Sequence, residues 1–353
     1  MTFCAPTFSC KLIGVHRWTA PSNASPRPCL RPHIRCTAQT PHRRSANYQP
    51  SSWSDEYIQS LRNDTKVEED NAARMGKLTE DVKQLIYMKK GIEDQLQLID
   101  HLQQLGVAYH FKEDIRDALW TIYRLFNRFI VEKGNLKASL RHQTKGLVSL
   151  CEASHLAKEA EHVLEEAINF TTKQLKSLME GSLEPHLREH VAHALELLLN
   201  WRMPRLQTRW FIEASQREAK MNPVLLELAK LDFNRVQSIH QRELREVSRW
   251  WSNLGLAQRL PFSRDRLMEN YFWTVGWAFE PQFARCREAQ TKANCLITTV
   301  DDVYDVYGTM DELELFTDAV DRWDVNATGK LPEYMKMCFL ALFNTTMTPH
   351  IML

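Results

Sequence analysis

From about residue 53 onward, apolar residues recur at steps of three and four, the spacing of one face of an α-helix. One such stripe consists of Val82, Leu85, Ile86, Ile92, Leu96, Ile99 and Leu102. It predicts a single helix that stops at Gly106. A long amphipathic helix is predicted after Pro223, and another from about Arg264 toward Pro281. Alternation with a period of two is almost absent and no repeat of fixed period occurs, so the fold class is expected to be all-α.

Polar residues indicate where several of these helices begin and end. Ser52, with Asp55 three residues later, is a possible cap for the first helix. Gly308 is placed to end a later helix in a left-handed turn. Thr309 and Glu312 then have the spacing of a capping box that opens the next helix.

The first 42 residues differ in composition from the rest of the chain. They hold five of the 45 Lys and Arg and none of the 44 acidic residues, and they are rich in Pro, Ser and Thr. This composition resembles a transit peptide, which we expect to be disordered and dispensable. A basic tail that binds nucleic acid or a membrane is the alternative, but its charges are scattered rather than grouped.

Without residues 1–42 the chain would carry 40 basic against 44 acidic residues, a balance that argues against a nucleic-acid partner. No apolar run approaches the roughly 18 residues that span a membrane. Outside residues 1–42, the four cysteines show no metal-ligand spacing. We interpret Cys151, Cys286, Cys295 and Cys338 as reduced thiols in the core.

Three aspartates follow a largely apolar stretch in the segment CLITTVDDVYDVYGT, residues 295–309. In a helix, Asp301 and Asp305 stack on one face and Asp302 lies on the neighbouring flank. The apolar stripe at Leu296, Val300 and Tyr304 is expected to face the core. Carboxylates crowded at a partly buried helix end suit a hard divalent cation such as Mg²⁺ or Mn²⁺. A solvated acidic helix end is the alternative interpretation.

Two arginines, Arg264 and Arg266, flank Asp265 at the predicted start of the preceding helix. If the two helices pack antiparallel through a turn at Pro281, this start meets the aspartate-bearing end. Guanidinium groups opposite metal-bound carboxylates would suit a diphosphate. A solvated loop is the alternative for the arginine segment taken alone.

Aromatic residues are frequent in the helix that begins after these arginines. Trp273 and Trp277 share a face, while Trp250 and Trp251 are expected in the core. Ring faces near a diphosphate would have a chemical use, because they stabilise a carbocation by about 0.5–2 kcal/mol each when water is excluded.

These motifs together resemble the terpene synthases of flowering plants, and within them the plastid monoterpene synthases. The aspartate motif is Asp301-Asp302-Val303-Tyr304-Asp305, and the arginine motif is Arg264-Asp265-Arg266. The segment RRSANYQPSSW, residues 43–53, carries the tandem arginine followed by tryptophan. The stretches EKGNLKASL, FTTKQLK, RWFIEA and FEPQFARCREA are also similar to the family, and the resemblance runs from about residue 43 to 346.

The resemblance implies a metal-dependent lyase that ionises geranyl diphosphate in the chloroplast stroma, with Mg²⁺ or Mn²⁺ as cofactor and a monomer as the expected state. It implies metal binding by Asp301, Asp302 and Asp305, with the first and last as direct ligands, and diphosphate binding by Arg264 and Arg266. It also implies a hydrocarbon pocket lined by Trp273, and an N-terminal strap that closes over the site and contains Arg43, Arg44 and Trp53.

The family pattern further implies three segments: the transit peptide at 1–42, an N-terminal α-helical terpene synthase domain at 43–205, and part of a class I terpenoid synthase α-helical domain at 206–353. The N-terminal domain is shorter than the pattern near residues 120–126. The second metal motif of the family, (Asn/Asp)-Asp-x-x-(Ser/Thr)-x-x-x-Glu, has no match after Asp305. We therefore expect impaired turnover.

Two further functions were compared with this lyase. One is a catalytically inactive helical protein that binds metal and diphosphate weakly. The other is a chain-elongating prenyltransferase, which is disfavoured because that class has two aspartate motifs of the same kind.

Overall fold

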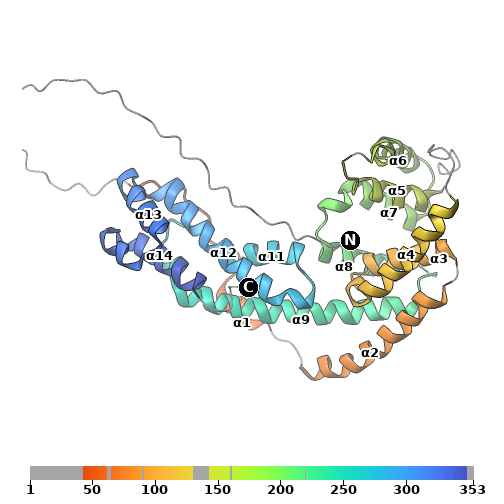
Figure 1. Ribbon diagram of the computed structural model, residues 1–353, viewed down its shortest axis with the longest axis horizontal. Coiled ribbons are helices and arrows are strands. Elements are labelled where there is room, and N and C mark those ends of the chain that lie inside the picture. The colour runs from red at the N-terminus through yellow and green to blue at the C-terminus, as the bar shows by residue number, and fades with distance from the viewer. Residues whose placement is uncertain are drawn as a thin grey trace, which may run out of the picture. The chain divides into compact units, whose positions relative to one another are not determined.

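The computed structural model (Figure 1) describes residues 43–61, 65–89, 91–129, 143–159, 161–218 and 220–347, with the backbone alone for residues 65–70, 124–129 and 163. The chain divides between residues 42 and 43, and the predicted transit peptide lies outside the described residues. Within the described part every regular element is helical, which confirms the all-α fold. None of the described helices is both long enough and apolar enough to cross a membrane.

The helices of the first part are α1 (Asp55–Ser60), α2 (Thr65–Met88), α3 (Ile92–Gln104), α4 (Lys112–Phe129), α5 (Thr144–Ser154), α6 (His162–Glu180), α7 (Pro185–Glu196) and α8 (Pro204–Ser215). The later helices are α9 (Pro223–Leu254), α10 (Leu256–Arg259), α11 (Leu267–Trp277), α12 (Ala284–Asp302), α13 (Met310–Arg322) and α14 (Glu333–Thr346). The 3₁₀ turns are η1 (Ala108–Phe111), η3 (Leu199–Trp201), η4 (Pro281–Phe283) and η6 (Val325–Lys330), and η5 (Val303–Tyr307) is a π-helical turn.

Helix α9 connects the two largest hydrophobic cores. Near its start, Leu225 and Leu228 pack with residues of α2, α3 and α8. Near its end, Val247 and Trp251 pack with residues of α12, α13 and α14. Figure 1 shows α9 beside α2 at one end and beside α11 and α12 at the other. The domain boundary predicted at residues 205 and 206 stays a prediction.

Smaller cores complete the packing. One joins Ile58 of α1 to Leu244 of α9 and to Tyr271 and Val275 of α11. The other holds α5, α6 and α7 together through Leu147, Leu175 and Val191. The first of these matters for function because it fixes α11 against α9.

Capping residues explain the bounds of α9. Asn222 accepts a hydrogen bond from the main-chain nitrogen of Val224, and Pro223 occupies the first turn. At the other end Gly255 adopts a left-handed conformation, with φ of 65°. The helix predicted after Pro223 is therefore confirmed.

Two predictions about the first helices are wrong. Ser54 caps α1 instead of Ser52, because its side chain accepts the Tyr57 amide at 3.2 Å. The stripe predicted as one helix is divided between α2 and α3, and Gly91 stands in an extended conformation at the start of α3. Glycine is a poor residue for a helix interior. The predicted stop at Gly106 is confirmed, with φ of 71°.

The cysteine prediction needs one correction. All four described cysteines are free thiols, and Cys151, Cys295 and Cys338 are buried as expected. Cys286 is exposed, because it lies on the outer face of α12 next to the fully buried Arg287. Of the two tryptophans expected in the core, Trp251 is buried, and Trp250 is half-buried and packs against the same core.

Candidate active site

The start of α11 meets the end of α12, as predicted from the turn at Pro281. The main-chain nitrogen of Arg264 donates to Asp302 Oδ2 at 2.7 Å, and Arg264 Nε donates to Asp302 Oδ1 at 2.9 Å. The Asp302 side chain is 1% exposed and the Arg264 side chain is 34% exposed. We call this region, residues 264–266 and 301–305, the mouth.

The other two aspartates of the aspartate motif, Asp301 and Asp305, face solvent. Partial burial raises the pKa of Asp301, and the negative charge of Asp305 raises it further, whereas Arg264 lowers it. A cation beside these two carboxylates would relieve that repulsion, so the donor set suits Mg²⁺. Among the described residues, no group of three His, Cys, Asp or Glu side chains converges on one point. The two carboxylates therefore supply only part of a coordination shell.

Asp302 differs from its neighbours in that both of its oxygens accept hydrogen bonds from Arg264. The Ser263 hydroxyl adds a longer contact of 3.4 Å. The hydrogen bonds with Asp302 raise the pKa of Arg264. The structure thus places Asp302 as a partner of Arg264, while its predicted role as a metal ligand stays a prediction.

The turn after the aspartates departs from the expected α-helix. Helix α12 ends at Asp302 and η5 continues as a π-turn, in which the Gly308 amide donates to Val303 O at 2.8 Å. The left-handed turn predicted at Gly308 is wrong, because its φ is −67° and its ψ is 145°. A Cβ at this position would lie 2.8 Å from Val303 O and 2.7 Å from Leu313 Cδ2. Glycine is needed here because Val303 and Leu313 leave no room for a Cβ, and not because the backbone has a positive φ.

The capping box predicted after this turn is confirmed. Thr309 and Glu312 each accept a hydrogen bond from the other's main chain at the start of α13. The apolar stripe is also confirmed: Leu296 is buried, and Val300 and Tyr304 pack against the same core. The exposed carboxylates are therefore held on a turn that is packed on one side and capped at its end.

The three residues of the arginine segment, 264–266, contact different parts of the protein. Asp265 accepts a hydrogen bond from the indole of the buried Trp251 at 3.0 Å. Arg266 donates to Asp265 O and to Gln49 O, both at 2.8 Å. Asp265 therefore fixes the segment to the core, and Arg264 and Arg266 project from it at the mouth.

The segment 43–53, which we call the strap, reaches the mouth from the other end of the sequence. Arg43 donates to both carboxylate oxygens of Glu312, with 2.7 Å between Nη2 and Oε1. The Tyr48 ring lies 5.1 Å from the guanidinium of Arg264. Arg44 and Trp53 are both exposed, and the Trp53 ring lies 5.6 Å from the Tyr57 ring.

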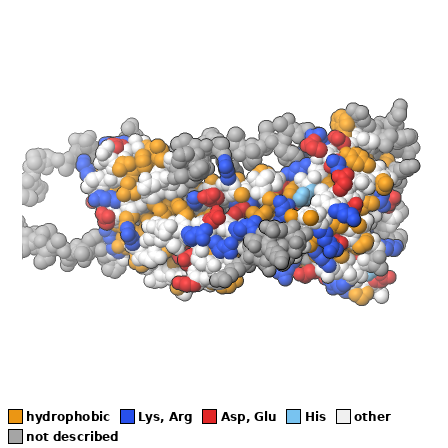
Figure 2. Space-filling model, turned by 90° about the horizontal axis from the view of Figure 1, so that it is seen from below, with side chains coloured by type: hydrophobic (Ala, Val, Ile, Leu, Met, Phe, Trp, Pro, Cys, Tyr) orange, Lys and Arg blue, Asp and Glu red, His pale blue; other side chains and the backbone are white. Residues whose placement is uncertain are grey.

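The aromatic side chains of α11 divide into a buried and an exposed set. Tyr271 is buried, whereas Trp273 and Trp277 are 64% and 61% exposed. Phe272 is exposed beside them. Figure 2 shows hydrophobic side chains uncovered among charged ones on the face that it displays. Trp273 and Trp277 therefore face solvent, and the hydrocarbon pocket predicted around Trp273 stays a prediction.

Residues at the opposite end of the α11 and α12 pair were not found from the sequence. Arg287 is fully buried, donates to both oxygens of Glu243 at 2.7 and 2.8 Å, and also bonds Ala278 O and Glu280 O. The Tyr271 hydroxyl donates to Glu243 at 2.8 Å. This network fixes the turn between the helices. The one feature of the sequence that could have indicated this network is the arginine at a core-facing position of α12.

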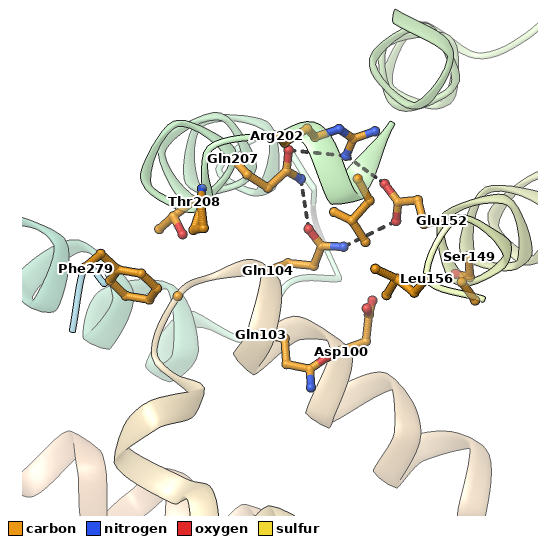
Figure 3. A pocket seen from close by; sticks show the side chains of 14 residues that line it. Asp100, Gln103, Gln104, Ser149, Glu152, Leu156, Arg202, Gln207, Thr208 and Phe279 are labelled. Carbon is orange, nitrogen blue, oxygen red and sulfur yellow. Dashed lines mark hydrogen bonds and ion pairs between the residues drawn. The ribbon is translucent and has the colours of Figure 1, made fainter. Parts of the chain in front are cut away.

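A cavity of about 340 Å³ lies elsewhere, lined mainly by α3, α5 and α8 (Figure 3). Arg202 bonds Glu152 at 2.8 Å, and Gln104 accepts from Gln207 at 2.9 Å. Burial, together with the charge of Glu152, raises the pKa of Asp100 to about 6. These polar groups largely satisfy one another, and the cavity contains none of the predicted site residues.

Comparison with known proteins supplies the family. The family description "Terpene synthase, N-terminal domain" matches residues 52–125 and 123–195, and "Terpene synthase family, metal binding domain" matches residues 252–349. Monoterpene synthase 8, chloroplastic, from Hedychium coronarium is 51% identical over 94% of this chain and 64% of that protein. (-)-Alpha-terpineol synthase from Vitis vinifera is 49% identical over 86% of this chain and 57% of that protein.

Solved structures agree with this result. Limonene synthase with 2-fluorolinalyl diphosphate matches with a TM-score of 0.80 at 40% identity, over 86% of this chain and 63% of that one. Isoprene synthase from grey poplar, in complex with three Mg²⁺ ions and dimethylallyl-S-thiolodiphosphate, matches with a TM-score of 0.71 at 43% identity, over 84% of this chain and 61% of that one. The chain spans about three fifths of the length of the curated relatives that it matches.

Proposed function

Because this chain belongs to the terpene synthase family, we propose that its mouth binds geranyl diphosphate with Mg²⁺ or Mn²⁺ and releases the diphosphate as a leaving group. The observation that carries the proposal is the meeting of Arg264 with Asp302 beside the exposed Asp301 and Asp305. These residues lie within the stretch matched by the metal-binding domain. Chloroplastic relatives favour a plastid location, and we place the chain in the stroma.

Asp301 and Asp305 would hold the metal, because their carboxylates are exposed and repel each other. A divalent ion bound there supplies positive charge to the diphosphate as its bond to carbon breaks. Arg264 and Arg266 would bind the diphosphate oxygens, since guanidinium groups match them with paired hydrogen bonds. Asp302 would keep Arg264 aimed at the mouth.

Breaking the carbon–oxygen bond of an allylic diphosphate leaves a carbocation on the hydrocarbon. The rings of Trp273 and Trp277 project from α11, the helix that begins directly after the arginine segment. Each aromatic face would stabilise that cation by about 0.5–2 kcal/mol where water is excluded. Loss of a proton or capture of water would then give the monoterpene. The proposed partner is therefore one small-molecule substrate, with no nucleic acid, and a monomer is the proposed state.

A second candidate function is binding of metal and diphosphate without turnover. The incomplete coordination shell at Asp301 and Asp305 favours it, because two carboxylates alone would leave the charge of the departing diphosphate poorly neutralised. The two candidates share the mouth and differ only in the steps from ionisation onward. This difference can be measured directly.

The test is incubation of the 353-residue chain with geranyl diphosphate and Mg²⁺, with volatile products identified by gas chromatography. The control variant replaces Asp301 and Asp305 by Asn, which preserves shape and removes both charges. Monoterpene products in the wild type that vanish in the control would support the lyase. Magnesium-dependent pyrophosphate binding with no product would support the second candidate. Absence of both would contradict the proposed site.

A further inference from the structure

The cavity shown in Figure 3 has room for a small molecule. Its volume of about 340 Å³ lies at the lower end of the range of ligand pockets in proteins, roughly 300–1,000 Å³. Helices α3, α5 and α8 supply most of its lining, and Phe279 adds a wall from the turn after α11. The cavity is separate from the mouth, since none of residues 264–266 or 301–305 lines it.

One side of the cavity carries polar side chains that are already paired. The Arg202 side chain is 4% exposed, and it donates to Glu152 Oε1 at 2.8 Å and to Gln207 Oε1 at 3.3 Å. Gln104 donates to Glu152 Oε2 at 3.3 Å and accepts from Gln207 at 2.9 Å. The charge of Glu152 is therefore balanced by a buried guanidinium, and the amide groups are oriented by their neighbours.

Asp100 is the carboxylate of the cavity that this network leaves without a cation. It lies on α3, one turn before Gln104, and Figure 3 shows its carboxylate pointing toward the side where Leu156 lies. Among the described residues no Lys, Arg or His forms an ion pair with it. Burial and the charge of Glu152 raise the pKa of Asp100 to about 6, so that it is still ionised at neutral pH. One negative charge of the cavity is then unbalanced.

Most of the other side chains that line the cavity are uncharged. Several of them are apolar: Ala153, Leu156, Leu199, Pro204 and Phe279. A complementary ligand therefore carries one positive charge and a short hydrocarbon body. A metal ion fits less well, because within the described part of the chain no three His, Cys, Asp or Glu side chains converge. An ammonium group needs fewer charged neighbours, since its three N–H groups can donate to carboxylate, amide and hydroxyl oxygens alike.

Phe279 connects this cavity with the turn between α11 and α12. Its carbonyl accepts a hydrogen bond from His240 at 2.9 Å. The carbonyls of its neighbours, Ala278 and Glu280, accept from Arg287. A molecule that contacts the Phe279 ring would therefore touch the turn that this network fixes.

We propose that the cavity binds a small organic ammonium ion, with the ammonium group at Asp100 and the hydrocarbon body against Leu156 and Phe279. Glu152 stays paired with Arg202 when the ion is bound, and Asp100 alone supplies the charge that attracts it. The binding step does not depend on the lyase reaction, so it can be tested whether or not the chain turns over a diphosphate.

The first experiment compares two probes of equal length, n-butylammonium and the uncharged n-butanol. Saturation-transfer NMR on the full chain at neutral pH measures such weak affinities. We expect n-butylammonium to bind at least about tenfold more tightly, because one charge-assisted contact is added. Equal affinities for the two probes would overturn the proposal, as would failure of n-butylammonium to bind.

The second experiment removes the charge and keeps the shape. Asp100→Asn should weaken n-butylammonium binding about tenfold and leave n-butanol binding unchanged. Asp94→Asn, on an exposed part of the same helix that does not line the cavity, is the matched control and should bind both probes like the wild type. Unchanged n-butylammonium affinity in Asp100→Asn would refute the role of this carboxylate.

Two further variants locate the bound probe. Ala153→Leu fills part of the cavity from α5 and should weaken both probes, with circular dichroism showing that the variant is folded. Unchanged binding in this variant would place the probes outside the cavity and overturn the proposal. The exposed carboxylates at the mouth could also attract a cation, so Asp301 and Asp305 are replaced together by Asn. That double variant should bind n-butylammonium like the wild type, and loss of binding there would move the site to the mouth.

Discussion

The two ends of the α11 and α12 pair contain the same chemical unit, an arginine paired with a carboxylate, in opposite environments. At the turn end Arg287 is 0% exposed and bonds both oxygens of Glu243 as well as two main-chain carbonyls. At the mouth end Arg264 is 34% exposed and pairs with Asp302. The Arg287–Glu243 pair is enclosed by protein, whereas the Arg264–Asp302 pair is exposed to solvent on the arginine side.

The difference separates an ion pair that holds the fold together from the one that we propose serves the site. At the turn end the pair is closed further by Tyr271, whose hydroxyl also donates to Glu243. The mouth end places Asp301 and Asp305 beside the pair, with the pKa of Asp301 raised. Carboxylates whose pKa is perturbed in this way cluster at functional sites, where a ligand can relieve the repulsion. The fixed turn between α11 and α12 thereby keeps the arginine segment aligned with the aspartates at the mouth.

The largest expected effect is at the turn. Arg287→Ala would leave Glu243 buried without its cation, so we expect unfolding free energy to fall by about 3–5 kcal/mol. Urea denaturation followed by circular dichroism measures this. Arg285→Ala, on the exposed face of the same helix, is the matched control and should change stability by less than about 0.5 kcal/mol. Similar losses in the two variants would remove the distinction between the ends.

The second effect concerns pH at the turn end. Burial, together with the charge of Arg287, lowers the pKa of His240 from 6.5 to about 4. As pH falls, the unfolded chain protonates this histidine before the folded chain does. The stability that neutral His240 contributes is therefore complete above pH 6.5 and is lost as pH falls toward 4. This amounts to about 3 kcal/mol.

His240→Gln can still donate to the Phe279 carbonyl that His240 bonds at 2.9 Å, but it does not titrate. Its stability should therefore fall less steeply than that of the wild type between pH 6.5 and pH 4. Urea midpoints across this range measure the slopes. The half-buried His101, His190 and His193 also have lowered pKa values, so the comparison is between the two slopes. Parallel slopes would show that His240 is not held neutral.

The third effect is at the mouth. Arg264→Ala should weaken pyrophosphate binding in the presence of Mg²⁺ by about 1.5–3 kcal/mol. Arg264→Lys should also bind weakly, because an ammonium cannot reproduce two parallel hydrogen bonds. Lys330→Ala is the control and should bind like the wild type. Calorimetry on samples shown to be folded gives the three affinities, and equal values would exclude the arginine from the site.

The smallest effect tests the turn that holds the aspartates. Gly308→Ala would place a methyl group against Val303 O and Leu313, so the π-turn must shift, with a cost of about 1–3 kcal/mol. Gly329→Ala is the control, because a Cβ added at that position would have no other atom within 4 Å. Thermal unfolding of both variants measures the cost. Equal midpoints would mean that the turn adapts freely.

Local signals made much of the fold predictable. Asn222, Pro223 and Gly255 mark both ends of α9, and Thr309 with Glu312 marks the start of α13. Such signals are strong because a cap is formed by residues a few positions apart. The mouth was predictable for a related reason, since one turn at Pro281 brings the two motifs together.

The remaining features depend on neighbours that are distant in sequence. Burial of Arg287 is explained by Glu243 on another helix, and the need for glycine at position 308 is explained by Leu313 and Val303. The break at Gly91 was hidden because apolar residues continue at helical spacing on both sides of it. Periodicity predicts which face of a helix is apolar. It does not predict which polar residue of another helix contacts that face.

The bond between Arg43 and Glu312 also has a consequence for the order of assembly. It joins residues 269 positions apart, so closing that loop costs considerable chain entropy and brings little until both ends are already held. The packing of α13 and α14 must precede it, because Glu312 lies on α13 and the Tyr334 hydroxyl that bonds its carboxylate lies on α14. Docking of the strap is therefore expected to be among the last steps of folding, and the mouth stays open to solvent until the rest of the chain is in place.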